Sequence, residues 1–206
     1  MMASILTKKL IAQMREISES STKLEGLVAG DGSQNPKFIL VSEAPGKNEA
    51  REGIGFIGPA GQELQNWLNY LGLTRDQIYM TGTVRARPFN ERNGVKRDRP
   101  PTKLEIKEFA KFLDYELQHL NSDLIVPMGN TGLQRLLGND ARITQLHGQI
   151  LHRRIQEYDA EKDAFVLSEK EWTLIPTFHP SYIRRFPNKN RTLVMNDLKT
   201  IKNYLN

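Results

Sequence analysis

Residues 37–46, KFILVSEAPG, carry the clearest indication of the fold. Four apolar residues follow one another without a polar break, and a carboxylate, a proline and a glycine come soon after them. An unbroken apolar run of this length is typical of a strand buried on both faces, since a strand with one face in water alternates apolar and polar residues. Three more runs of this kind lie at 77–81, 122–127 and 171–177.

Helical patterns separate these four runs. Apolar residues recur at helical spacing over 61–71 and 102–120, and the second pattern opens with the capping-box sequence TKLE. Shorter helices are expected at 131–137 and 193–205. Strands that alternate with helices predict a three-layer α/β/α sandwich with a short, mainly parallel four-stranded sheet. In such sheets the functional crevice lies at the carboxyl ends of the strands.

The chain of 206 residues shows no internal repeat and no low-complexity linker, so a single domain spanning 1–206 is expected. Residues 1–30 form an N-terminal segment that begins with the apolar spacing of an amphipathic helix, which we expect to pack on its own domain. Residues 148–171 have the pattern of a polar hairpin inserted before the last strand. Residues 84–99 carry six cations and are expected to form a long basic loop.

Composition excludes several kinds of site. The chain has no cysteine, which excludes disulfides, thiolate nucleophiles, cysteine-ligated zinc and cysteine-ligated iron–sulfur clusters. The net charge of +5 permits an anionic partner such as nucleic acid without establishing one. No apolar run approaches the ~20 residues that span a bilayer, and the first residues lack the pattern of a secretory signal. We therefore expect a cytoplasmic protein with no membrane partner.

Two segments that follow strand ends carry the chemistry. The first places Glu43 directly after a strand and continues through GFIGPAG at 55–61, a loop whose backbone N–H groups could face an anion or a polar ring. It lacks the Gly-Lys-Ser/Thr ending of a phosphate-binding P-loop. In the second segment, TFHPSYIRR at 177–185, His179 follows a buried strand and precedes a proline that fixes the turn. An exposed Glu in a tight connection and a purely structural His are the alternatives.

Several segments occur in the order found in one known family. They are EAPG at 43–46 with Gly53, GFIGPAG at 55–61, RP at 87–88, MGNT at 128–131, LLG at 136–138 and TFHPS at 177–181. Together these segments resemble the uracil-DNA glycosylase superfamily, and most closely its iron–sulfur branch, known as family 4. The resemblance runs from about Val28 to the C-terminus, and the ordered set is far more specific than any of its parts.

The resemblance implies an enzyme that flips a damaged nucleotide out of the DNA stack and hydrolyses the bond between base and sugar. Glu43 matches the family's acidic residue, which orients water and favours the sugar cation. His179 matches the residue that hydrogen-bonds the departing base, and Phe56 matches the aromatic that stacks on the flipped ring. Further base contacts are expected at Ala44 and Gly82. No lysine stands in a matched catalytic position, so strand cleavage through a Schiff base is not expected.

DNA, single- or double-stranded, is the partner that the resemblance implies, and the protein is expected to act as a monomer. Ser181 and the glycine-rich turns would contact flanking phosphates, as would the basic loop. A wedge formed by residues 182–185 would fill the gap left in the duplex. The residues expected to bind DNA are Gly46, Lys47, Gly61, Arg85, Arg87, Ser181, Tyr182, Arg184 and Arg185.

The sequence departs from the family 4 pattern at the four cysteines that hold its cluster. The N-terminal pair would fall in the region 16–22, which reads EISESST. Ala86 stands at the third position, and the fourth falls near Phe109 or Ala110. We therefore expect no cluster, no other cofactor and no metal, with apolar packing in the place of the cluster.

A second departure concerns recognition of the base. The family's uracil-binding Asn falls on Gly82, which offers no side chain. Three hypotheses remain open: uracil read by backbone and water, a wider pocket for another deaminated base such as hypoxanthine, or nucleic-acid binding without catalysis. Thr81 and Thr83 are candidates for replacement hydroxyls. The working hypothesis is excision of uracil or another deaminated base, and its rival is a binding protein that kept the glycosylase fold without the chemistry.

Overall fold

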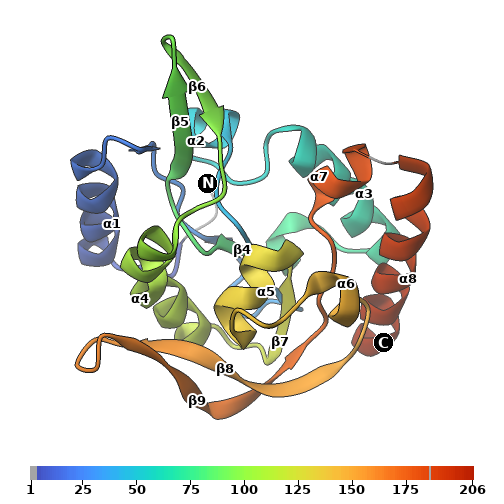
Figure 1. Ribbon diagram of the computed structural model, residues 1–206. Coiled ribbons are helices and arrows are strands. Elements are labelled where there is room, and N and C mark those ends of the chain that lie inside the picture. The colour runs from blue at the N-terminus through green and yellow to red at the C-terminus, as the bar shows by residue number, and fades with distance from the viewer. Residues whose placement is uncertain (1–3, 186) are drawn as a thin grey trace.

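A six-stranded sheet forms the centre of the computed structural model, which describes residues 4–185 and 187–206 and, within 184–189, the backbone alone (Figure 1). The strand order is β2-β4-β3-β7-β9-β8, and the inner four strands run parallel. The parallel four-stranded sheet of the prediction is therefore present, with an antiparallel strand added at each edge. The strands are β2 (Asp31–Gly32), β3 (Ile39–Ser42), β4 (Tyr79–Gly82), β7 (Leu124–Pro127), β8 (Leu151–Asp159) and β9 (Ala164–Leu174).

Two layers of helices cover the sheet. Leu40 of β3 packs in one apolar cluster with residues of α3 (Pro59–Leu71) and α8 (Pro187–Leu205), whereas Ile39 and Val41 pack in another with residues of α4 (Lys103–His119). Successive side chains of a strand point to opposite faces, so an unbroken apolar strand needs a cover on each side. This arrangement confirms the predicted α/β/α sandwich.

Local signals in the sequence place the ends of these helices. Thr102 caps α4 by accepting a hydrogen bond from the N–H of Glu105, and Glu105 returns one by accepting from the N–H of Thr102 at 2.7 Å. Pro59 opens α3, and Gly72 ends it in a left-handed conformation. The terminal helix begins at Pro187, six residues before the predicted 193. The shorter helices are α2 (Lys47–Glu52), η1 (Arg75–Gln77), α5 (Gly129–Leu137), α6 (Ile143–Leu146) and α7 (Pro180–Arg185).

The N-terminal helix α1 (Lys8–Ser20) packs on the rest of the chain, as predicted. Its buried Met14 lies in an apolar cluster with Leu24 of β1 (Leu24–Glu25) and with Phe109 and Phe112 of α4. None of the described helices combines the length and the apolar character that crossing a membrane requires.

One prediction about an irregular segment is wrong, and another is right except for where its second strand ends. The basic segment 84–99 is largely an antiparallel hairpin of β5 (Arg87–Arg92) and β6 (Val95–Asp98), which pairs with β1 in a three-stranded sheet. Asn93 and Gly94 form its two-residue turn with φ of 52° and 72°, the geometry that an Asn-Gly pair favours. The hairpin predicted at 148–171 is present, because β8 pairs antiparallel with β9. Its second strand runs unbroken from Ala164 to Leu174, so the hairpin is part of the sheet and not an insertion before the last strand.

Candidate active site

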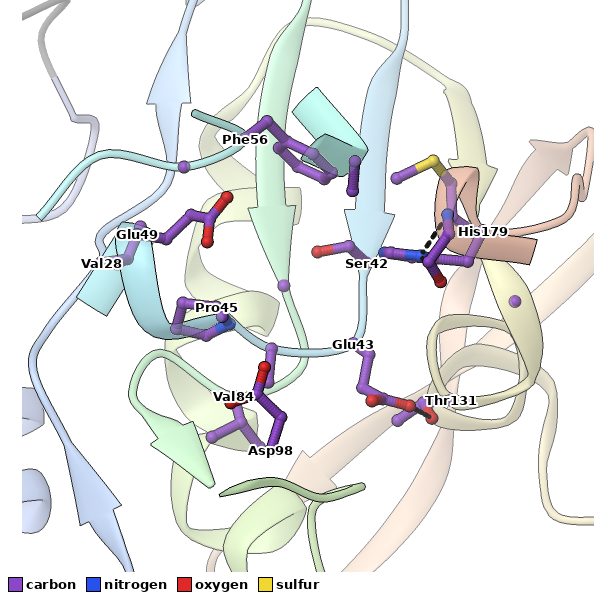
Figure 2. A pocket seen from close by; sticks show the side chains of 18 of the residues that line it. Val28, Ser42, Glu43, Pro45, Glu49, Phe56, Val84, Asp98, Thr131 and His179 are labelled. Atoms are coloured by element: carbon purple, nitrogen blue, oxygen red, sulfur yellow. Dashed lines mark hydrogen bonds between the residues drawn. The ribbon is translucent and has the colours of Figure 1, made fainter. Parts of the chain in front are cut away.

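A cavity of about 890 Å³ opens at the carboxyl ends of the parallel strands (Figure 2). This volume lies in the upper part of the range for small-molecule sites, about 300–1,000 Å³. Its walls come from the loops after β3, β4, β7 and β9, so segments far apart in the sequence meet there, as the topology predicts. The residues expected to act on a base that line it are Glu43, Ala44, Phe56, Gly82 and His179.

Glu43 is the first residue after β3, and both its backbone and its side chain are held. Its carbonyl oxygen accepts hydrogen bonds from the N–H and the hydroxyl of Thr83, at 3.1 and 2.6 Å. Its Oε2 accepts a hydrogen bond from the hydroxyl of Thr131 at the start of α5 (Figure 2). A carboxylate has two oxygens, so Thr131 can fix its direction while the other oxygen accepts from a water molecule.

His179 stands between the last strand and α7, where Pro180 begins the helix. The backbone N–H of Ser181 donates to its Nδ1 at 3.2 Å, and the Ser181 hydroxyl lies 2.8 Å from the same nitrogen. Because a backbone N–H can only donate, Nδ1 is the acceptor, and the neutral ring carries its proton on Nε2. This tautomer is the one that can donate a hydrogen bond to a departing base.

A buried carboxylate supports the strand end that carries His179. Asp197 of α8 is 1% exposed, accepts a hydrogen bond from the Thr177 hydroxyl at 2.8 Å and lies 2.8 Å from Nδ1 of His147. Burial raises the pKa of Asp197, while hydrogen bonds from His147 and Thr177 act in the opposite direction. The His147 ring packs on Phe178, the neighbour of His179, at 4.6 Å between ring centres. Asp197 carries no motif in the sequence, so only the fold reveals it.

Phe56 is held in a conformation that bulky residues rarely adopt. Its φ is +55°, and its ring is half-buried against the large apolar cluster beside α3. Arg75 fixes this turn from outside by donating to the carbonyl oxygens of Phe56 and Gly55 at 3.0 and 2.6 Å. Gly61 lies so close that a Cβ there would be 1.8 Å from the Phe56 oxygen. Over-determined backbone of this kind is frequent at functional sites, and it sets the ring at the edge of the cavity.

Glu49 holds the loop that contains Phe56 at its other end. Its Oε1 accepts a hydrogen bond from the N–H of Gly58 at 2.8 Å, which ties α2 to the start of α3. Figure 2 shows its carboxylate on the wall that faces His179 across the cavity. Neither Arg75 nor Glu49 stands out in the sequence, because a single charged residue has no pattern until the loop closes around it.

Gly82 ends β4 and leaves one part of the cavity wall without a side chain. A Cβ there would meet the Ser42 hydroxyl and the Val84 carbonyl oxygen at 3.3 Å, which is tight but not prohibitive. The hydroxyl of Thr83 donates to the Glu43 carbonyl, and that of Thr81 donates to Glu116 at 2.5 Å. Both hydroxyl protons are therefore engaged within the protein.

Comparison with known proteins agrees with this geometry. The family model of the uracil DNA glycosylase superfamily matches residues 29–199, which include Glu43, Phe56 and His179. The chain belongs to the uracil DNA glycosylase superfamily. It is 30% identical over 181 residues to a type-4 uracil-DNA glycosylase of Thermotoga maritima, covering 87% of this chain and 83% of that protein.

Two further relatives differ in how much of their own length is similar to this chain. A type-4 uracil-DNA glycosylase of Sulfurisphaera tokodaii is 31% identical over 180 residues, covering 85% of this chain and 73% of that protein. A DNA polymerase of Bacillus phage SP01 is 29% identical over 177 residues, or 85% of this chain but only 16% of the polymerase. In the phage polymerase, the segment that is similar to this chain is thus a small part of a much longer protein.

This superfamily member does not fit the iron–sulfur cluster of the type-4 branch. Ala86 and Phe109, at two of the expected ligand positions, are 0% exposed and pack in the apolar cluster around Met14. Ala110, the alternative for the fourth position, is equally buried. Among the described residues, no group of three His, Asp or Glu side chains could hold a metal ion. At the third and fourth ligand positions the structure has the apolar packing that the sequence predicted.

Arg85 and Arg87 do not reach the surface, contrary to the prediction that they contact phosphates. Their exposed fractions are 1% and 3%. Arg85 forms an ion pair with Glu116 beneath the cavity, and Arg87 pairs with Glu25 and Asp98 at the foot of the hairpin. Counting cations in a sequence treats every arginine as a surface charge. In this fold Arg85 and Arg87 are buried, because each forms an ion pair with a carboxylate.

The other predicted DNA contacts differ in how accessible they are. Gly46 precedes α2, and Lys47 is the first residue of that helix. The N–H of Gly61 donates to the Gly58 carbonyl at 2.9 Å, so it is already engaged. Tyr182 stacks on Phe178 at 4.7 Å between ring centres. Ser181 lies beside His179 at the cavity, and the side chains of Arg184 and Arg185 lie outside the described part of the structure.

Proposed function

We propose that the chain is a monofunctional DNA glycosylase that hydrolyses the N-glycosidic bond of a deaminated base, with uracil as the first candidate, and leaves an abasic site. The observation that carries the proposal is the meeting of Glu43, Phe56 and His179 at one cavity. These side chains come from three separate loops, and each suits a different demand of the reaction.

The reaction separates charge, and the site is arranged for this separation. As the bond between the base and C1′ breaks, its electron pair moves to the base, and the sugar becomes cationic. The Nε2–H of His179 would donate to the base oxygen on which negative charge collects, and Phe56 would stack on the ring. Glu43 would stabilise the sugar cation and orient the water that adds to C1′, accepting the proton which that water loses. One preorganised donor of this kind contributes about 10²–10³ in rate.

The cavity draws its walls from residues 28 to 182, which supports the prediction that the chain works as a single domain. DNA is the proposed partner because the relatives are named as DNA glycosylases and a DNA polymerase. We propose that the protein binds it as a monomer in the cytoplasm and needs no metal ion.

Gly82 favours a second candidate, a DNA-binding protein with little or no excision activity. A site that reads a base by hydrogen bonds loses discrimination when a reader is removed, because the base must then be held by stacking and shape alone. The same glycine also enlarges the cavity for a deaminated purine. The two candidates predict opposite results in one experiment.

The experiment uses labelled single- and double-stranded oligonucleotides that carry uracil, hypoxanthine or xanthine. After incubation, alkali converts abasic sites to strand breaks. We expect breaks with at least one of these bases and none with His179→Ala or Glu43→Ala. The matched controls are His152→Ala and Glu171→Gln, exposed positions on the β8–β9 ribbon, and both should retain activity. Tight, salt-dependent binding without breaks on any substrate would favour the second candidate.

A further inference from the structure

The β5–β6 hairpin is the exposed basic feature that the burial of Arg85 and Arg87 leaves unexplained. It rises from the edge of the molecule at which α7 lies, with α2 at its foot (Figure 1). Pro88, Asp98 and Arg99 at its base line the cavity. The hairpin therefore stands on the rim of the proposed active site.

The pairing register gives the hairpin two different faces. Asn90 lies opposite Arg97, and Arg92 lies opposite Val95, so these four side chains share one face. The other face carries Phe89, Glu91, Lys96 and Asp98, where acids and bases are mixed. One face of the hairpin thus carries two arginines and no acid.

The cationic face is not neutralised from within the protein. Arg92 and Arg97 are exposed, and neither forms an ion pair with any residue that the structure describes. On the opposite face, Lys96 pairs with Glu25 at 2.6 Å. Desolvation alone would raise the pKa of Glu25, but hydrogen bonds from Lys96 and Arg87 hold it below its usual value. Glu25 and Asp98 are thus paired with Lys96 and Arg87, and Glu91 lies on the face away from Arg92 and Arg97.

The hairpin is also held in one shape. It pairs with β1, its turn has the favoured Asn-Gly geometry, and Arg99 at its foot forms an ion pair with Glu105 of α4 at 2.6 Å. A preformed charged surface loses little conformational freedom on binding. The four steps from Pro88 to Arg92 span about 13 Å at about 3.3 Å each, and Arg97, opposite Asn90, lies about half as far from Pro88. These distances correspond to about two to four nucleotides along one strand of B-form DNA.

We propose that the Arg92 and Arg97 face of this hairpin binds backbone phosphates of the DNA strand that leaves the cavity, about two to four nucleotides from the flipped base. The proposal rests on the proposed function, because it takes DNA as the ligand of the cavity. It assigns to the hairpin a sequence-independent contact, which adds affinity and holds the strand while a base is tested in the pocket. In this proposal Arg92 and Arg97 make the phosphate contacts that the sequence predicted for Arg85 and Arg87.

The test measures how binding to a lesion-free duplex depends on salt, with a labelled duplex long enough to pass the hairpin on both sides. Removal of one bound phosphate makes the slope of log K against log salt shallower by about 0.9. For Arg92→Ala/Arg97→Ala we expect a slope shallower by about 1.8. Lysine at both positions should restore the slope, because the interaction depends on charge. The control Arg153→Ala/Arg154→Ala removes two exposed arginines from β8 and should leave the slope unchanged.

Binding to lesion-free DNA does not require excision, so the two proposals fail separately. An unchanged slope in the hairpin variant, or an equal change in the β8 control, would overturn the hairpin proposal even if excision is normal. A protein partner on this face would also leave the slope unchanged. Conversely, a shallower slope in a protein that excises no base would support the hairpin contact and reject the proposed function alone.

Discussion

The rim that carries the proposed catalytic residues and the wall expected to read the base belong to the same cavity but are built in opposite ways. On the rim, Glu43 is directed by Thr131, and His179 is held in one tautomer by Ser181. On the wall, Gly82 presents only backbone, and the neighbouring threonine hydroxyls are turned to other partners. In the proposed mechanism, bond cleavage and base recognition are therefore separable, because the groups proposed to stabilise developing charge differ from the position expected to read the base.

The largest effect on excision is expected when the His179 side chain is removed from the rim. His179→Ala should lower the rate of excision at saturating enzyme by about 10²–10³-fold, because the departing base loses its hydrogen-bond donor. Single-turnover kinetics on a uracil-containing strand measure this rate. DNA binding should remain unchanged, and a loss of binding in place of rate would mean that His179 holds the DNA and does not assist the reaction.

A second test acts on the rim through the backbone. Gly61→Ala places a methyl group where the Phe56 carbonyl lies, so the loop must shift and displace the stacking ring. A displacement of about 1 Å costs about 10²-fold in rate, and overpacking of this kind destabilises a fold by about 1–3 kcal/mol. Thermal unfolding and single-turnover kinetics together measure both effects. Gly55→Ala is the control, since its added carbon would lie 3.7 Å from Val28, an ordinary contact distance.

A smaller effect is expected at Thr131. The substitution Thr131→Val keeps the shape of the side chain but removes the hydroxyl that directs Glu43. A hydrogen bond to a charged group contributes about 1.5–3 kcal/mol, so we expect a loss of at least about tenfold in kcat with little change in KM. A rise in KM with kcat unchanged would indicate that Thr131 supports binding of the substrate and does not orient Glu43.

The smallest effect is expected at Gly82 on the cavity wall, where a substitution tests base recognition separately from bond cleavage. Gly82→Asn restores an amide where the superfamily resemblance expects one, at the cost of a small adjustment near Ser42 and Val84. The ratio of uracil to hypoxanthine excision should rise several-fold, while the rate on the preferred base changes little. Gly82→Ala fills part of the same space without an amide and is the control. An equal ratio in all three proteins would show that this position does not read the base.

The parallel strands were predictable because each is a short apolar run followed by turn residues. For the same reason the positions of Glu43 and His179 at strand ends could be placed from the sequence. The hairpin of β5 and β6 could not, since its strands are charged and lack the alternation that marks a half-buried strand. Arg75 and Asp197 were equally hidden, because each acts through partners at least 19 residues away in the chain.

The amino-acid sequence alone was enough to predict the layered α/β/α architecture, the places of Glu43 and His179 at strand ends, the missing side chain at Gly82 and the absence of cluster ligands. These features depend on residue type and local spacing, which are visible in one dimension. Only the tertiary structure decided which of the arginines in 84–99 reach the surface. Arg85 and Arg87 are neutralised by Glu116, Glu25 and Asp98, whereas Arg92 and Arg97 remain exposed. The charge of a side chain follows from its residue type, but its burial and its partner depend on long-range packing.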